Sequence, residues 1–144
     1  MPRLRDEEGR LRLESYPRTI EMRVVYADVD SLQRLSASAV GRFFEEGRAA
    51  TFVELFGVAA VQAGSPVQLS LDSIAIEQLV QGRYPGFVTI ATAISAFEDG
   101  RLGHSAAIFQ GPRCLALCEA LSLHAAAAPT GEVAATLEKL RYRG

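Results

Sequence analysis

Four acidic residues flank the junction between a strand-like and a helix-like segment of this chain. Asp28 and Asp30 follow a run of alternating residues, and Glu45 and Glu46 lie in the next, helix-like run. At such a junction a carboxylate is solvated, caps the helix or takes part in chemistry. An ionised carboxylate can attack an electrophile directly or act as a general base toward water. The sequence therefore raises the question of which of these three roles each acid has.

The segments on both sides of the aspartates have clear periodicity. In residues 19–26, apolar and polar residues alternate, which predicts a half-buried strand. A helix of about 18 residues is expected after a cap at Ser36 or Ser38, ending at Gly57. Helical spacing places Glu46 at the rim of the apolar face and Glu45 nearly opposite it. That apolar face comprises Val40, Phe43, Phe44 and Gly47.

The second half of the chain has the patterns of strands and turns. Strands are expected at residues 68–80, 87–97, 102–110 and 114–125, separated by QGRYPG, EDG and QGPR, and residues 134–140 favour a short helix. Consecutive hairpins would join these strands into a four-stranded meander. One strand, one long helix and then a run of strands indicate an α+β fold with the helix packed on an antiparallel sheet.

Size and composition limit the classes of function. The chain has 144 residues and a net charge of −2, which fits a single domain spanning residues 1–144 and disfavours a nucleic-acid partner. Residues 1–17 are expected to form an arm or a frayed edge. The charged N-terminus lacks the pattern of a secretory signal and no apolar run could span a membrane, so we expect a cytoplasmic protein without a membrane partner.

The cysteines and histidines show no metal-binding spacing. Cys114 and Cys118 lie four residues apart in one predicted strand, about 13 Å, which is too far for a disulfide between them. Two distant histidines with these cysteines suggest no metal site, and no phosphate loop, dinucleotide fingerprint or G-x-S-x-G elbow occurs. Any catalysis must therefore use carboxylates, backbone dipoles and binding, without a cofactor.

Several segments together resemble the hotdog-fold acyl-CoA thioesterases of the 4-hydroxybenzoyl-CoA thioesterase type. YADVD and FFEEGR match the family's Asp-x-Asp strand end and its helix, and RYPGFVTIAT, GRLGHSAAIFQ and TGEVAATLEKLR resemble later segments. The resemblance covers about residues 19–142. It departs at Gln33 and Arg34, where the family usually has Gly-His, and at Ser36 and Ala37, where it usually has Asn-Asn.

The resemblance implies a hotdog fold, a five-stranded antiparallel sheet wrapped around a long central helix, and hydrolysis of an acyl-CoA to a free acid and CoA. Asp30 matches the family's second aspartate, the nucleophile or general base, with Glu46 as the reserve catalytic carboxylate. The backbone N–H groups around Ser36, Ala37 and Ser38 would polarise the thioester carbonyl. CoA is then part of the substrate.

The resemblance also implies binding residues and an assembly. Gly103, His104 and Ser105 would line the channel for CoA, and Arg83 is a candidate for contact with it. Because adjacent strand residues point to opposite faces, His104 and Ser105 are not expected to form a catalytic pair. A homodimer or homotetramer with a shared site is expected. The alternatives are a non-catalytic acyl-CoA binding protein and a hydratase or dehydratase of acyl thioesters, although the latter's Asp-x-Asn-x-x-x-His-like set is not visible.

Overall fold

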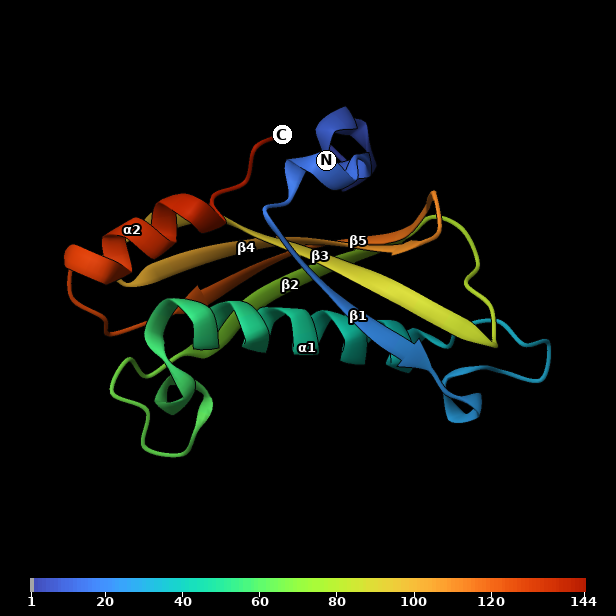
Figure 1. Ribbon diagram of the computed structural model, residues 1–144, viewed down its shortest axis with the longest axis horizontal. Helices are drawn as coiled ribbons and strands as arrows, with labels where there is room; N and C mark the ends of the chain where they lie inside the picture. The colour runs from blue at the N-terminus through green and yellow to red at the C-terminus, as the bar shows by residue number, and fades with distance from the viewer. Residues whose placement is uncertain (1) are drawn as a thin grey trace.

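The computed structural model describes residues 2–144 and consists of a five-stranded antiparallel sheet with a long helix along one face (Figure 1). The order of the strands across the sheet is β1-β3-β4-β5-β2. The strands are β1 (Arg18–Val24), β2 (Ser70–Gln78), β3 (Gly86–Glu98), β4 (Arg101–Gln110) and β5 (Arg113–Leu123), and the helices are α1 (Ala37–Phe56) and α2 (Gly131–Leu140). The predicted α+β class is confirmed.

The strand order corrects one expectation. Strands β3, β4 and β5 form the predicted hairpins, but β2 pairs with β5 and not with β3, so the four strands are not a meander. Strand β1 pairs with β3 over residues 18–24 and 86–92 and occupies the edge that β2 would need. The connection of residues 79–85 carries the chain across the sheet, which leaves β2 at the opposite edge.

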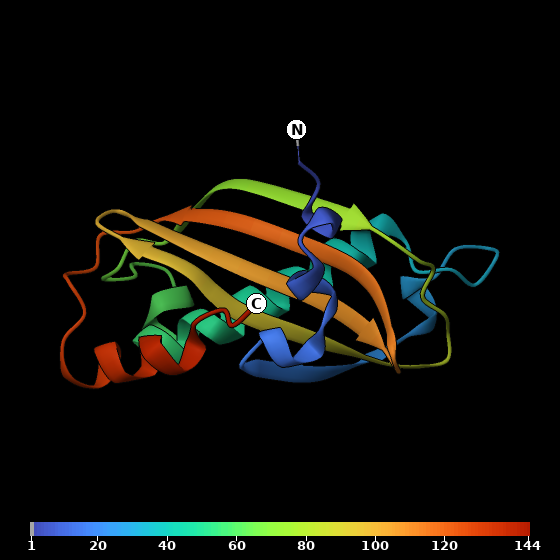
Figure 2. The ribbon, with the colours of Figure 1, turned by 90° about the horizontal axis from the view of Figure 1, so that it is seen from above.

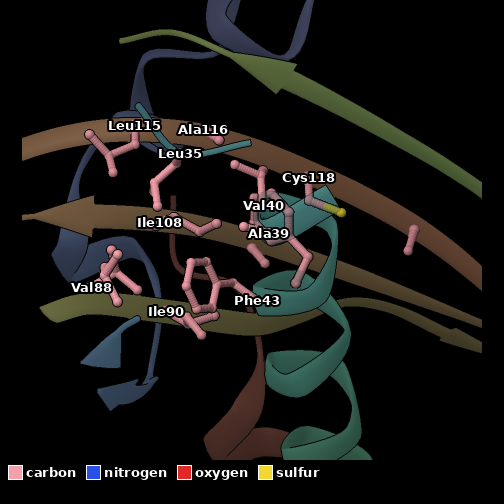
Figure 3. Packing of buried hydrophobic residues seen from close by; sticks show 14 residues of the cluster. Leu35, Ala39, Val40, Phe43, Val88, Ile90, Ile108, Leu115, Ala116 and Cys118 are labelled. Atoms are coloured by element: carbon pink, nitrogen blue, oxygen red, sulfur yellow. The ribbon is translucent and has the colours of Figure 1, made fainter. Parts of the chain in front are cut away.

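The core lies between α1 and the inner face of the sheet (Figure 3). Phe43 is fully buried and lies against the strands that carry Ile90 and Ile108. Gly47 allows the helix to approach closely, because a Cβ atom there would lie 2.7 Å from the Cγ2 of Ile90. The helical face predicted from Val40, Phe43, Phe44 and Gly47 is buried as expected. Aromatic and β-branched side chains therefore hold α1 along the sheet.

The opposite face of the sheet is covered by the two ends of the chain. Residues 4–15 form three 3₁₀ turns that cross the strands near the C-terminus (Figure 2). Buried Arg10 donates from Nη1 to Glu119 Oε2 over 3.2 Å and to Ser105 Oγ over 3.3 Å. The hydroxyl of Tyr16 donates to the Arg10 carbonyl over 2.7 Å. The N-terminal arm is thus a packed layer, and the expectation of a frayed edge was wrong.

The C-terminal helix leads to a residue that pairs with the part of β3 that β1 leaves unpaired. Helix α2 begins three residues earlier than expected, at Gly131, and buries Leu137 and Leu140 against a cluster with Phe52 and Leu55 of α1. After it, Arg141 forms a parallel bridge with Ile94, beyond the end of the β1–β3 ladder. Among residues 2–144, no helix is long and apolar enough to cross a bilayer.

Candidate functional site

Asp30 lies in a small closed loop between β1 and α1. Val29 and Leu35 form an isolated bridge, and the N–H of Asp30 donates to the Arg34 carbonyl over 2.9 Å. The loop is anchored to the sheet connection, because the N–H of Leu35 donates to the Gly82 carbonyl over 3.2 Å. The loop therefore places Asp30 at a defined position just before the helix.

Residues within the same loop hold the Asp30 carboxylate in its ionised form. Its Oδ1 accepts the N–H groups of Leu32 and Arg34 over 2.9 and 3.1 Å, and its Oδ2 pairs with Arg34 Nε over 3.2 Å. The Arg34 backbone N–H, supported by that of Leu32 and by the Arg34 charge, lowers the pKa of Asp30. The side chain is still 39% exposed, so a reactant in solvent can reach it. Asp30 is thus both a turn residue and an accessible carboxylate.

Asp28, in contrast to Asp30, is buried and bonded to neighbouring segments of the chain. It is 5% exposed, its Oδ2 accepts the N–H of Val25 over 2.9 Å, and its Oδ1 pairs with Arg42 of α1 over 2.6 Å. Its carbonyl also accepts the N–H of Ser36 over 2.9 Å. These contacts tie the end of β1 to the first turns of α1. Asp28 therefore fixes the junction in which Asp30 lies.

We expect Asp28→Asn to lower the free energy of unfolding by about 1–3 kcal/mol, because the substitution removes a charge-assisted hydrogen bond to Arg42 and can leave a buried polar atom without a partner. Chemical denaturation followed by far-UV circular dichroism measures this change. The matched control is Asp99→Asn, at an exposed aspartate in the β3–β4 turn. Equal stability of the two variants would contradict the role assigned to Asp28.

The start of α1 has unused backbone donors. Ser36 is the N-cap, and its Oγ accepts the N–H of Ala39 over 3.1 Å. The N–H groups of Ala37 and Ser38 have no helical carbonyl four residues earlier to which they could donate. Within residues 2–144 neither of them donates a hydrogen bond. These groups and the helix dipole favour negative charge at this position. This is the electrostatic feature that a polarised carbonyl oxygen requires.

Arg83 lies at the same end of the molecule as Asp30. Arg83 and Arg34 form an isolated bridge, and the Gln110 side chain holds the backbone of Arg83 through two hydrogen bonds of 3.0 Å. The Arg83 side chain is exposed and forms no ion pair within the described chain. The structure thus brings the backbone of Arg83 to the loop that holds Asp30, although the two residues lie far apart in the sequence.

Glu46 lies away from this group. It is exposed on α1, ten residues after Ser36, which corresponds to about 15 Å along a helix. Its neighbour Glu45 is also exposed and lines a cavity beside the second half of α1. Within one chain, Asp30 and Glu46 are therefore separate carboxylates, and a catalytic role for Glu46 stays a prediction.

His104 and Ser105 point to opposite faces of β4, as expected. On the helix side, His104 Nε2 lies 3.2 Å from Thr51 Oγ1, and burial, with the nearby charge of Arg48, lowers the pKa of His104 to about 3. On the other side, Ser105 donates to Glu119 and accepts from Arg10. His104 is thus a neutral core residue at physiological pH, with no catalytic partnership to Ser105.

Gly103 lies next to these residues in the middle of the sheet. A Cβ atom at Gly103 would lie 2.6 Å from Ser95 Oγ, so the strand packs closely there. His104 and Ser105 are at most 1% exposed in the single chain. The prediction that residues 103–105 line a CoA channel is untested by these contacts and stays a prediction.

Arg48, the last residue of the FFEEGR segment, is not among the site residues predicted from the sequence. Its spacing from Phe44 and Phe52 places it on the apolar side of α1, where an arginine is unusual. In the structure its Nη1 is buried without a hydrogen-bond partner among residues 2–144. The signal that could have identified it was this charged residue at helical spacing between two core aromatics.

Of three comparisons with known proteins, the one with solved structures finds matches, and these support the fold. No protein-family model matches the chain, and no curated protein matches it. Among solved structures, a predicted thioesterase from Bacillus stearothermophilus is similar with a TM-score of 0.73 and 15% identity, covering 88% of this chain and 97% of the other. A gentisyl-coenzyme A thioesterase has a TM-score of 0.72 and 14% identity, with 84% and 99% covered.

A third similar structure carries a bound ligand. A thioesterase from Thermus thermophilus, complexed with coenzyme A and Zn, has a TM-score of 0.69 and 14% identity, with 88% of this chain and 94% of the other covered. At such identities the likeness concerns the backbone arrangement, which is a sheet of five antiparallel strands against one long helix. The chain therefore has the hotdog fold, in a form that matches solved thioesterase structures over most of its length.

Proposed function

We propose that this chain is an acyl-CoA thioesterase that uses Asp30 as its catalytic carboxylate. The observation that carries the proposal is the position of an ionised, accessible carboxylate just before a helix start with two unused backbone N–H groups. A thioester carbonyl at the start of α1 would have its oxygen polarised by the N–H groups of Ala37 and Ser38. The same fold occurs in structures named as thioesterases, one of them with bound coenzyme A.

The reaction balances without a cofactor. The carboxylate of Asp30 attacks the thioester carbon, or removes a proton from a water that attacks it, and the carbon–sulfur bond breaks. The thiolate of CoA leaves and takes up a proton, and the acyl group ends as a free acid. Direct attack passes through a mixed anhydride that water then cleaves. The lowered pKa of Asp30 suits attack by the carboxylate better than proton removal, because a general base works best with a pKa near the working pH.

Release of free thiol from a panel of aliphatic and aromatic acyl-CoAs tests the proposal. A thioesterase releases stoichiometric thiol and free acid at a rate proportional to enzyme concentration. An absence of thiol release across the panel would overturn the proposal.

A second candidate function is non-catalytic binding of acyl-CoA. The observation that favours it is the pairing of Asp30 with Arg34, the residue that stands where the resembled family has histidine. Because the backbone N–H and the side chain of Arg34 both bind the Asp30 carboxylate, that carboxylate then stabilises the loop and does not react. Retained binding of acyl-CoA without thiol release would identify this function.

We further propose that β2 pairs with a second copy of the chain. Within the described chain β2 pairs on one side only, with β5, and an unpaired edge strand is a site for association. Three apolar side chains on β2 are 38–46% exposed, namely Leu71, Ile74 and Ile76. An antiparallel contact between two β2 strands would cover them by twofold symmetry.

Ile74→Lys should convert the proposed dimer to a monomer, because symmetry places the new charges near each other at the edge. Sedimentation velocity at micromolar concentration measures the change. Val58→Lys is the control, because Val58 is 60% exposed and lies outside β2. A wild-type chain that sediments as a monomer would contradict the dimer.

A further inference from the structure

A cavity of about 370 Å³ lies beside the second half of α1, away from Asp30. Its walls come from α1, from the segment between α1 and β2, and from β2 with its neighbour β5. Figure 1 shows where these elements lie. Apolar walls are contributed by Phe52 and Leu69, and polar groups by Arg48 and Ser122. Its size is at the lower end of the range for small-ligand sites.

Arg48 has an unusual electrostatic position in this cavity. Its Nη1 is buried and makes no hydrogen bond within residues 2–144. Seven arginines of the described chain are paired with carboxylates, and the other unpaired ones are exposed. Arg48 is therefore, in the described residues, the one unpaired arginine that is not on the open surface. Arg48 is half-buried, and leaving its buried nitrogen without a partner is costly, which favours binding of an anion there.

The residues behind Arg48 cannot neutralise its charge. His104 is buried and has a pKa of about 3, so it is neutral near pH 7, and burial raises the pKa of the Cys118 thiol to about 12. The charge of Arg48 lies close enough to both groups to act on them. It adds to the effect of burial in lowering the pKa of His104, and it opposes the effect of burial on the pKa of Cys118. Both neighbours are thus uncharged at that pH, and the positive charge faces the cavity.

The lining also selects among anions. Ser122 is 2% exposed and no hydrogen bond engages its hydroxyl within the described chain, so it is a second donor in the cavity wall. Glu45 lines the same cavity, and its negative charge opposes an anion there, more strongly for a multiply charged group such as a phosphate than for a single carboxylate. A single negative charge carried on an apolar chain fits a guanidinium, a hydroxyl and the apolar walls.

We propose that this cavity binds a carboxylate through Arg48, and that the substrate is an acyl thioester whose acyl chain ends in a carboxylate. The assignment of a substrate rests on the proposed thioesterase activity, whereas the carboxylate site does not. Arg48 lies twelve residues after Ser36, about 18 Å along the helix, so the cavity receives the far end of the acyl group and not the thioester.

Two measurements test the proposal on the full-length chain. The first is calorimetric binding of free dicarboxylates, from glutarate to hexadecanedioate, with the uncharged diol of equal length and inorganic phosphate as comparison ligands. The second is thiol release from ω-carboxyacyl-CoAs of the same lengths and from their uncharged counterparts. The chain length of the best carboxylated substrate then reports the span from the reacting carbonyl to Arg48.

Arg48→Met and Arg48→Lys are the informative variants. Methionine keeps the length and apolar stem of the side chain, and we expect it to weaken dicarboxylate binding and kcat/KM for carboxylated substrates on the order of 10- to 100-fold, with little change for uncharged substrates. Lysine should retain part of both. Arg101→Met, at an exposed arginine on β4, is the matched control and should change neither.

The outcomes separate this inference from the proposed function. Thiol release without preference for a carboxylated chain, or with equal loss on both substrate classes in Arg48→Met, would overturn the carboxylate site and leave the thioesterase intact. Tighter binding of phosphate than of any dicarboxylate would also overturn it. Dicarboxylate binding that depends on Arg48, without thiol release from any thioester, would support the site and overturn the thioesterase. The wild-type preference is measurable even where a variant fails to fold.

Discussion

Asp30→Asn should reduce thiol release from acyl-CoA by a factor of at least about 10²–10⁴, the usual contribution of a positioned general base and a lower bound for loss of a nucleophile, while binding of acyl-CoA is retained. Asparagine keeps Oδ1 as an acceptor for the N–H groups of Leu32 and Arg34, so the loop before α1 stays closed. The substitution removes the negative charge that attacks the thioester or activates water. Steady-state thiol release and calorimetric binding of a non-hydrolysable acyl-CoA analogue measure the two effects separately.

Asp99→Asn is the matched control for this experiment. Asp99 is exposed in the β3–β4 turn and makes no side-chain hydrogen bond within the described residues. It tests the same change of charge far from the start of α1. If Asp30→Asn and Asp99→Asn release thiol equally fast, Asp30 is a turn residue only, and the catalytic assignment fails.

The pH dependence of the wild-type enzyme provides a second readout. Backbone and side-chain contacts with Arg34, together with the Leu32 N–H, lower the pKa of Asp30, and the active form is the ionised carboxylate. As the pH falls, the rate of thiol release should therefore stay at its full value through the pH range in which an ordinary aspartate titrates. It should be lost only at the lower pH at which Asp30 itself takes up a proton. An acid limb above the ordinary aspartate range would indicate that another group controls the reaction.

Phe43→Ala should lower the free energy of unfolding by about 3–5 kcal/mol, the usual cost of deleting a fully buried aromatic ring. Phe43 has no exposed surface and packs with Val88, Ile90 and Ile108 between α1 and the sheet (Figure 3). A domain is commonly stable by about 5–15 kcal/mol, so this loss is a large part of the total. Because the chain has no tryptophan, urea unfolding followed by far-UV circular dichroism is the suitable measurement.

Two further variants make the Phe43 result specific. Phe43→Leu retains most of the apolar volume and should cost less than Phe43→Ala. Val58→Ala removes apolar atoms from a side chain that is 60% exposed and should change stability by less than about 0.5 kcal/mol. All variants are compared at one protein concentration, because association adds to apparent stability. A Phe43→Ala chain as stable as Val58→Ala would contradict the described packing.

Local periodicity was sufficient to predict most elements of this chain. Alternation in residues 19–26 and helical spacing of Val40, Phe43, Phe44 and Gly47 predicted β1, shorter by two residues at its end, and the buried face of α1. Ser36 was predicted as one of two possible caps and is the N-cap. Each of these features depends on residues within a few positions of one another, because periodicity reports which face of an element is apolar.

The order of the strands depended on tertiary contacts. An alternating pattern indicates that one face of a strand is apolar, but it does not indicate which other strand lies beside it in the sheet. The placement of β2 beside β5 followed from β1 occupying the edge of β3. The packing of residues 4–15 over the sheet likewise depended on Arg10 meeting Glu119, more than 100 residues away in the sequence.

The sequence by itself determined the kinds of elements, the apolar face of α1 and Asp30 as a candidate carboxylate at a helix start. Tertiary structure alone distinguished buried Asp28 from accessible Asp30, placed Arg83 near the loop of Asp30 and left Arg48 unpaired in a cavity. The physical reason is that the burial and charge balance of an ionisable group depend on side chains from distant segments, whose approach local periodicity does not encode.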